Sequence, residues 1–220
     1  MRLKSKPWAK GWIEEHSDFI YNNQKSQSNK GEWSKVFNNQ NPINLEIGTG
    51  KGGWIHQMAL KFPNQNFIGL EIQETAVAIA GRTILESGQQ PDNLILIYGD
   101  GASVETLFDP AEINKIYLNH SDPWPKARHQ KRRLTYKTFL KSYQTILKPN
   151  GYLEFKTDNR ELFDWSVESM TDFGMTYDDN QISYDLHKEI DKNPLNVMTE
   201  YEIKWSNKDV SENWICAKMP

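Results

Sequence analysis

An alternation of two kinds of segment, starting at residue 43, constrains the fold of this chain most strongly. Short apolar runs rich in Ile and Leu alternate with longer segments of helical period. The runs are too short for most helices, so they predict strands. Strands are predicted at 43–48, 66–71, 93–98, 114–119 and 152–157. Helices are predicted at 53–62, 73–87 and 131–147, and a fourth is marked by Phe163, Val167, Met170 and Phe173.

Strands that alternate with helices imply right-handed crossovers and a mostly parallel sheet covered on both faces. Two late strands, near 200–206 and 213–218, are expected to close one edge as an antiparallel pair. At 220 residues the chain suits one well-packed domain. We expect that domain at 41–220, behind a partly mobile N-terminal arm at 1–40.

Polar residues and glycine fall at the end of each predicted strand. In open α/β sheets the ligand lies beyond the carboxyl ends of the strands, near the switch in strand order. The residues in these positions are Gly48, Glu71, Asp100, Asp122 and Asp158. Their placement predicts a binding site at that edge of the sheet.

The glycine-rich turn after the first strand predicts a site for an adenosine cofactor. Gly48, Gly50 and Gly53 satisfy the G-x-G-x-x-G pattern, and Glu71 is placed to bind ribose hydroxyls. Glu46, two residues before Gly48, would repel a pyrophosphate. This favours S-adenosylmethionine, which carries no phosphate, over NAD.

Asp100, in Tyr-Gly-Asp-Gly-Ala, has two interpretations. It could accept a hydrogen bond from the adenine amino group, or it could serve only the turn.

Asp122-Pro123-Trp124-Pro125 indicates a rigid substrate loop, because proline fixes φ. A carboxylate at this place can accept hydrogen bonds from the N1–H and amino group of guanine, and an aromatic ring gives a base a face to stack on. The alternative is a turn stiffened by proline, with Trp124 used for packing.

A dense basic block follows this loop. Eight of the 26 Lys and Arg residues lie between Pro123 and Leu153, a stretch that has no Asp or Glu, and the rest of the chain is acidic. A local basic stripe on an acidic body predicts a polyanionic partner that docks in one place. Within the block, His129 is interpreted as a surface or phosphate contact.

Two further polar groups stand out, Lys156 to Arg160 and Thr199 to Glu202. Each could be a helix cap or the start of an exposed strand.

The composition predicts a soluble, cytoplasmic protein. Cys216 is the single cysteine, which suits a reducing compartment and offers no metal cluster. No apolar run approaches the length of a membrane span, and no apolar segment follows the cations near the N-terminus. We therefore expect neither a membrane nor a metal partner.

Taken together, these motifs resemble the bacterial tRNA (guanine-N7)-methyltransferases, the TrmB type, over nearly the whole chain. The matching segments are Glu46 to Gly52, Ser121 to Leu134, Phe155 to Arg160 and Thr199 to Glu202. The resemblance implies a class I methyltransferase Rossmann-like fold, S-adenosylmethionine as cofactor, and methylation of a guanine in the variable loop of tRNA.

The resemblance also implies roles for individual residues. The cofactor would be lined by Glu46, Gly48, Gly50, Glu71, Asp100 and Asp122, with Asp122 also the catalytic candidate. The substrate would be contacted by Lys126, Asp158, Thr199, Glu200, Tyr201 and Glu202. The RNA-binding segment would be Arg128, His129, Gln130, Lys131, Arg132 and Arg133.

Two alternatives remain open. One is another methyltransferase, acting on an amino group of a nucleobase or a protein, because those enzymes carry similar loops. The other is a non-catalytic RNA-binding protein on the same fold, which the retention of Glu46, Glu71 and Asp122 disfavours.

Overall fold

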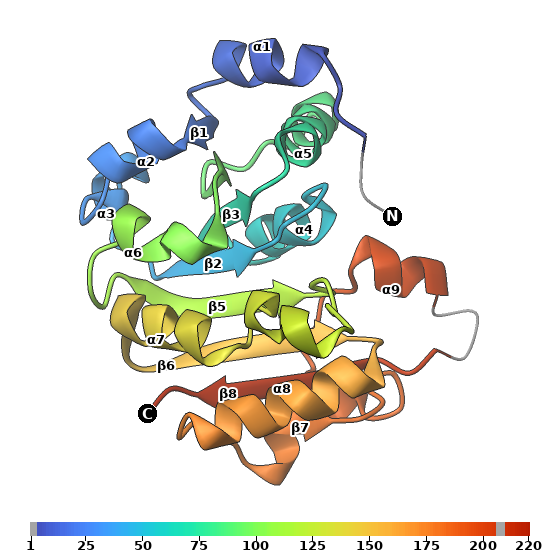
Figure 1. The fold of residues 1–220 in the computed structure, drawn as a ribbon. Helices are drawn as coiled ribbons and strands as arrows, with labels where there is room; N and C mark the ends of the chain where they lie inside the picture. The colour runs from blue at the N-terminus through green and yellow to red at the C-terminus, as the bar shows by residue number, and fades with distance from the viewer. Residues whose placement is uncertain (1–3, 206–209) are drawn as a thin grey trace.

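A computed structural model describes residues 4–205 and 210–220 and shows a central sheet with helices on both faces (Figure 1). The sheet has the strand order β1-β4-β3-β2-β5-β6-β8-β7. Neighbours from β1 to β6 pair in parallel, whereas β8 is antiparallel to both β6 and β7. The strands are β1 (Ile20–Asn22), β2 (Ile43–Ile47), β3 (Asn66–Glu71), β4 (Leu94–Tyr98), β5 (Ile113–Asn119), β6 (Leu147–Thr157), β7 (Ile182–Ser183) and β8 (Asn213–Lys218).

Helices cover the two faces of the sheet and bury a separate core on each. One core contains α1, α4 and α5, and the other contains α3, α6, α7 and α8. Figure 1 shows α7 and α8 in front of the strands. The helices are α1 (Trp8–Glu15), α2 (Asn23–Ser28), α3 (Trp33–Val36), α4 (Gly53–Lys61), α5 (Glu74–Glu86), α6 (Val104–Leu107), α7 (Lys137–Ile146), α8 (Arg160–Asp172) and α9 (Glu200–Trp205).

The two cores explain the composition of the central strands. Every residue of β2 and of β3 is buried. A parallel strand covered by helices on both faces buries both of its sides. Ile, Leu and Phe dominate β2 and β3, and Asn44, Glu46, Asn66 and Glu71 are the buried polar exceptions. This pattern is why the sequence predicts these strands well.

The central elements confirm most of the predicted order. The five predicted strands correspond to β2 to β6, the helices at 53–62 and 73–87 to α4 and α5, and the fourth helix to α8. The helix predicted at 131–147 was wrong at its start. Residues Ala127–Arg132 form a 3₁₀ helix, the backbone is extended at Arg133, and α7 begins only at Lys137.

The late antiparallel pair was predicted only in part. β8 coincides with the strand expected at 213–218, but its antiparallel partners are β6 and β7. The other strand, expected at 200–206, was wrong: residues 200–205 form α9, and residue 206 lies outside the described residues. The physical reason is a helix-capping motif, described below.

Part of the segment before residue 40 belongs to the sheet. β1 pairs in parallel with β4 at one edge. Trp33 is fully buried, and its Nε1 donates to the carbonyl of Leu107 at 2.9 Å. In the part of the chain that the structure describes, no helix has both the length and the apolar character needed to cross a membrane.

Candidate active site

A cavity of about 590 Å³ opens at the carboxyl ends of β2, β3, β4 and β5. The strand order reverses here, because β2 is followed by β3 and β4 on one side and has β5 and β6 on the other. Open α/β sheets bind ligands at such a switch point. The cavity lining includes Gly48, Glu71, Asp100 and Asp122, so four of the residues predicted at strand ends come together.

The turn after β2 requires glycine because of its backbone conformation. Gly48 has φ of 82° and Gly50 has φ of 57°, both in the left-handed region. A Cβ at either position would meet no atom of the described residues within 4 Å, so the requirement is conformational and not one of space. Gly48 lines the cavity, whereas Gly50 supports it from outside by donating its amide to Glu71 at 2.8 Å.

Glu71, the last residue of β3, is fixed by the backbone around it. Its Oε2 accepts from the amide of Gly50 and its Oε1 from the amide of Gln73, both at 2.8 Å. Burial raises the pKa of Glu71, and the charge of Asp122 adds to the rise, while the amide bonds oppose it. Each carboxylate oxygen has two acceptor sites. The carboxylate is therefore pre-oriented and can still accept two hydroxyl groups from the cavity.

Glu46 lies beneath the cavity and is not among its lining residues. It is 3% exposed, accepts a hydrogen bond from the Thr49 hydroxyl, and accepts another from Asn119 Nδ2 at 2.8 Å. The second bond joins β2 to β5 across the switch point. Burial raises the pKa of Glu46 to about 7, although the hydrogen bonds from Thr49 and Asn119 oppose the rise.

Asp100 stabilises a turn and also lines the cavity. One oxygen accepts from the amide of Ala102 at 2.9 Å, which is turn chemistry at the start of a short 3₁₀ helix (Gly101–Ser103). The residue is exposed and lines the cavity. Its second oxygen is therefore open to a ligand.

The loop after β5 presents Asp122 to the cavity. Asp122 is exposed and lies on the wall formed with His120, Ser121 and Trp124. His120 and Trp124 have φ of 47° and 42°, a region that costs bulky residues about 1 to 3 kcal/mol. Such conformations gather at functional sites.

Trp124 is contacted by two side chains of the basic block. The Arg132 guanidinium lies 4.8 Å from the centre of the Trp124 ring, and the His129 ring meets it edge-on at 5.8 Å. These contacts hold the indole in place beside the cavity.

The structure divides the predicted RNA-binding segment. Lys126, Arg128, Lys131 and Arg132 are exposed, and Lys131 and Arg132 also line the cavity. His129 and Gln130 are half-buried. Arg133 is only 3% exposed, so the structure does not place it on a surface that phosphates can reach. This corrects the sequence-based interpretation of Arg133.

The predicted substrate residues of the tail form the start of α9 and do not line the cavity. Thr199 and Glu202 make a capping box: the Thr199 hydroxyl accepts from the amide of Glu202 at 3.0 Å, and Glu202 Oε2 accepts from the amide of Thr199 at 2.6 Å. The Tyr201 hydroxyl donates to Asp158 at 2.8 Å. Glu200 lies against Gly53 at the start of α4, where an added Cβ would be 2.5 Å from Glu200 Oε1.

Lys156 holds the start of α9 in place through buried hydrogen bonds. Its side chain is fully buried, and its Nζ donates to Glu202 at 2.8 Å and to the Val197 carbonyl at 3.0 Å. Burial alone would raise the pKa of Glu202, but the Lys156 charge, together with the hydrogen bonds from Lys156 and from the Thr199 amide, outweighs burial and the pKa is lowered.

Sequence reasoning missed a buried group beside this lysine, formed by His120, Glu202 and Glu212. The two ring nitrogens of His120 and the Oε1 atoms of both glutamates are buried and have no hydrogen-bond partner among residues 4–205 and 210–220. Burial lowers the pKa of His120 and raises the pKa of Glu212 to about 9. The group is built from the ends of β5, α9 and β8, and no local sequence pattern marks it.

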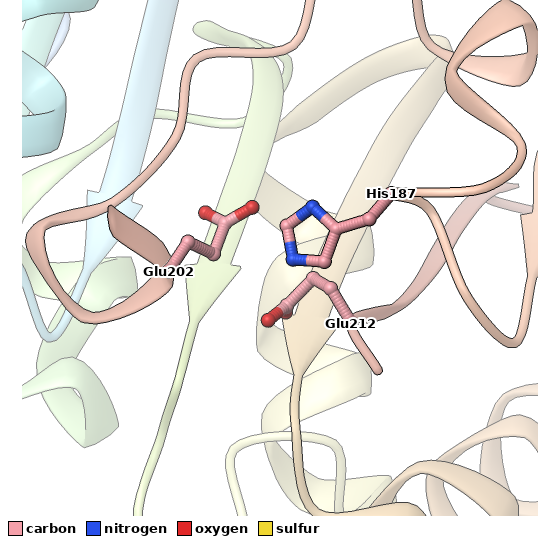
Figure 2. A group of neighbouring side chains, drawn as sticks. All are labelled: His187, Glu202 and Glu212. Carbon is pink, nitrogen blue, oxygen red and sulfur yellow. The ribbon is translucent and has the colours of Figure 1, made fainter. Parts of the chain in front are cut away.

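Figure 2 shows Glu202 and His187 facing each other, with Glu212 beside them. One ligand atom from each lies within 4.8 Å of the others. This set could hold a divalent cation, but tetrahedral zinc with bonds of about 2.1 Å needs ligand atoms roughly 3.4 Å apart. Lys156 already supplies a positive charge to Glu202. The spacing of the ligand atoms and this charge therefore both disfavour a zinc ion here.

Comparison with known proteins decides the family. A family model described as "Putative methyltransferase" matches residues 40–213. The tRNA (guanine-N(7)-)-methyltransferase of Oenococcus oeni is 55% identical over 215 residues, which cover 98% of each chain. That of Leuconostoc mesenteroides is 50% identical and covers 94% of this chain and 95% of its own. The chain belongs to the tRNA (guanine-N(7)-)-methyltransferase family.

Solved structures support the same fold for this tRNA (guanine-N(7)-)-methyltransferase family member. The 16S rRNA methyltransferase KamB matches with a TM-score of 0.61 and 11% identity over 86% of this chain and 93% of its own. A SAM-dependent methyltransferase from Aquifex aeolicus matches with a TM-score of 0.54 and 12% identity over 99% and 100%. The expected class I methyltransferase fold is confirmed.

Proposed function

We propose that this chain transfers the methyl group of S-adenosylmethionine to N7 of a guanine in the variable loop of tRNA. The observation that carries the proposal is the convergence of Glu71 and Asp122 on one cavity whose wall also includes Lys131 and Arg132. A cofactor end and a phosphate-binding end thus share one cavity. The relatives that bear this activity in their names cover nearly the whole chain.

The cavity suits S-adenosylmethionine, which supplies an electrophilic methyl group when bound. Glu71 accepts the ribose hydroxyls, since both its oxygens are already oriented by backbone amides. Gly48 lets the backbone approach the ligand, and the second oxygen of Asp100 accepts from the adenine amino group.

Asp122 acts on the base. Guanine N7 carries a lone pair and no proton, so no general base is needed before methylation. Methylation at N7 makes the ring cationic and strengthens its N1–H as a donor. An Asp122 carboxylate that accepts from that edge stabilises the transition state more than the ground state, and only such differential binding raises the rate.

The exposed part of the basic block holds the tRNA. Arg128, Lys131 and Arg132 neutralise backbone phosphates, and this interaction depends on salt and not on sequence. The half-buried His129 and Gln130 add polar contacts at the same surface. The protein works in the cytoplasm, where unmodified tRNA is available.

Incubation with methyl-labelled S-adenosylmethionine and tRNA that lacks modifications tests the proposal. We expect label in one guanine of the variable loop, and chain cleavage that is specific for N7-methylguanine should map it. Label in an exocyclic amine or in protein would favour another methyltransferase activity. tRNA binding without any transfer would favour an RNA-binding protein.

A further inference from the structure

Arg133 is set apart from its neighbours by burial. It is 3% exposed, whereas Arg132 and Arg128 are exposed. A buried charge is costly unless it is hydrogen-bonded or paired. The groups that Arg133 contacts therefore show what it does.

Among the described residues, both hydrogen bonds of the Arg133 side chain go to the loop that carries Asp122. Its Nε donates to the carbonyl of Pro123 at 3.0 Å, and its Nη2 donates to the carbonyl of Trp124 at 3.4 Å. The guanidinium group is a rigid fork of donors, which suits two consecutive carbonyls. Arg133 thus binds the backbone of the two residues that follow Asp122.

The guanidinium is itself fixed by α8. It lies 4.5 Å from the centre of the Trp165 ring, and that ring stacks on Tyr136 at 6.4 Å. α8 is anchored in the core by Leu162 and Phe163. The contacts form a continuous connection from the rigid core to the substrate loop.

The loop needs such support. Trp124 has φ of 42°, a left-handed conformation that is an outlier for a bulky residue. It also precedes Pro125, which restricts its backbone further. Strained backbone persists only where its surroundings hold it, and Arg133 binds the carbonyl of this same residue.

We propose that Arg133 is a positioning residue that holds the Asp122 loop in its reactive shape and does not contact RNA phosphates. The rate effect rests on the proposed function, because it supposes that Asp122 contacts the reacting base. The expected effect on the exchange of the loop does not rest on the proposed function.

The kinetic test compares Arg133→Met and Arg133→Lys with the parental protein in single turnover at saturating tRNA and cofactor. Arg133→Met should lower the rate at least tenfold, and Arg133→Lys should recover part of it because an ammonium can still donate to one carbonyl. The tRNA affinity and its salt dependence should stay within about twofold, since no phosphate contact is lost.

Arg82→Met is the matched control. The Arg82 guanidinium also lies over a tryptophan, 5.8 Å from the centre of the Trp8 ring, but on α5 and outside the cavity. Its rate should equal the parental one.

Hydrogen exchange of the peptide covering residues 120–128, measured without tRNA or cofactor, tests the loop independently of activity. Exchange should be faster in Arg133→Met and unchanged in Arg82→Met. If Arg133→Met does not fold, Arg133→Lys and Trp165→Leu should show the same direction.

Parental exchange together with a parental rate would overturn the proposal. A loss of tRNA affinity with a shallower salt dependence would overturn it too, by making Arg133 a phosphate contact. A parental protein that methylates no guanine N7 would remove the proposed function, while the exchange result would still decide the role of Arg133.

Discussion

Two carboxylates at strand ends, Glu71 and Asp122, serve the same cavity in different ways. Glu71 is 6% exposed and held by two backbone amides, whereas Asp122 is exposed on a loop. A fixed carboxylate suits a ligand that always binds in one pose. An exposed one suits a partner that supplies the rest of the enclosure, as a tRNA base would.

Replacing Asp122 by Asn tests its role in the chemical step. The change keeps the shape but removes the charge and turns one acceptor into a donor, so the developing charge on the base is no longer stabilised. We expect the single-turnover rate to fall at least about a hundredfold, equivalent to about 2.7 kcal/mol, with little change in tRNA affinity. A near-parental rate for Asp122→Asn would exclude Asp122 from the mechanism.

Replacing Glu71 by Ala tests the cofactor end. The loss of two charge-assisted hydrogen bonds, worth about 1.5 to 3 kcal/mol each, should weaken binding of S-adenosylmethionine and its demethylated product at least about tenfold in calorimetry. Glu86→Ala, an exposed change at the end of α5, is the control. Equal affinities in both variants would remove Glu71 from the site.

Glu212 should make stability depend on pH. Its pKa is raised by burial to about 9 in the folded state, from the ordinary value of 4.5. Between these values the folded protein keeps a proton that the unfolded chain releases. The stabilisation is therefore complete below pH 4.5 and is lost as pH rises through about 9, by up to about 1.4 kcal/mol per pH unit.

Denaturant unfolding of the parental protein and Glu212→Gln at pH 5, 6.5 and 8 measures this effect. The neutral amide cannot ionise, so the parental free energy of unfolding should fall with pH relative to that of Glu212→Gln. Parallel pH profiles would show that Glu212 is ionised in the folded protein.

At the scale of elements, α9 depends on its capping box. Thr199→Ala removes the hydroxyl that accepts from the amide of Glu202, and losses of this kind cost about 0.5 to 2 kcal/mol. Hydrogen exchange in residues 198–205 should become faster while the core strands stay protected. Thr106→Ala, at an exposed position of α6, is the control. If α9 exchanges at the parental rate, packing and not capping defines the helix.

The central elements could be predicted because their signals are local. β2 and β3 are short runs rich in Ile and Leu, and the residues at their ends, Gly48 and Glu71, mark the cavity. α9 also had a local signal, the T-x-x-E pattern of Thr199 and Glu202, but the sequence left this segment open between a helix cap and the start of a strand.

Other features could not be read locally. Arg133 fits the charged stripe of a helix that begins at 131, but the extended backbone at this residue turns it toward the loop instead. The meeting of His120 with Glu212 depends on β8 returning to the sheet beside β6, which only the tertiary fold supplies.

For the whole molecule, charge is concentrated where the tRNA is expected to lie. A triple variant, Arg128→Ala, Lys131→Ala and Arg132→Ala, should reduce the salt slope of tRNA binding by up to about 0.7 to 0.9 for each cation removed. The control removes three exposed lysines elsewhere: Lys10, Lys35 and Lys188. Equal slopes in the two variants would make the exposed basic block an ordinary solvated surface.

The place of β8 in the sheet has a consequence for synthesis of the protein on the ribosome. β8 lies between β6 and β7, so both of these strands lack a neighbour until residues 213–218 leave the exit tunnel. Translation that stops before residue 213 would leave two open strand edges, which favour aggregation. Such a truncation would also remove Trp214 of β8, the residue that pairs with Lys156 of β6. Nascent chains should therefore complete this edge of the sheet only after residues 213–218 have emerged, and chains truncated before residue 213 should be substrates for quality-control proteases.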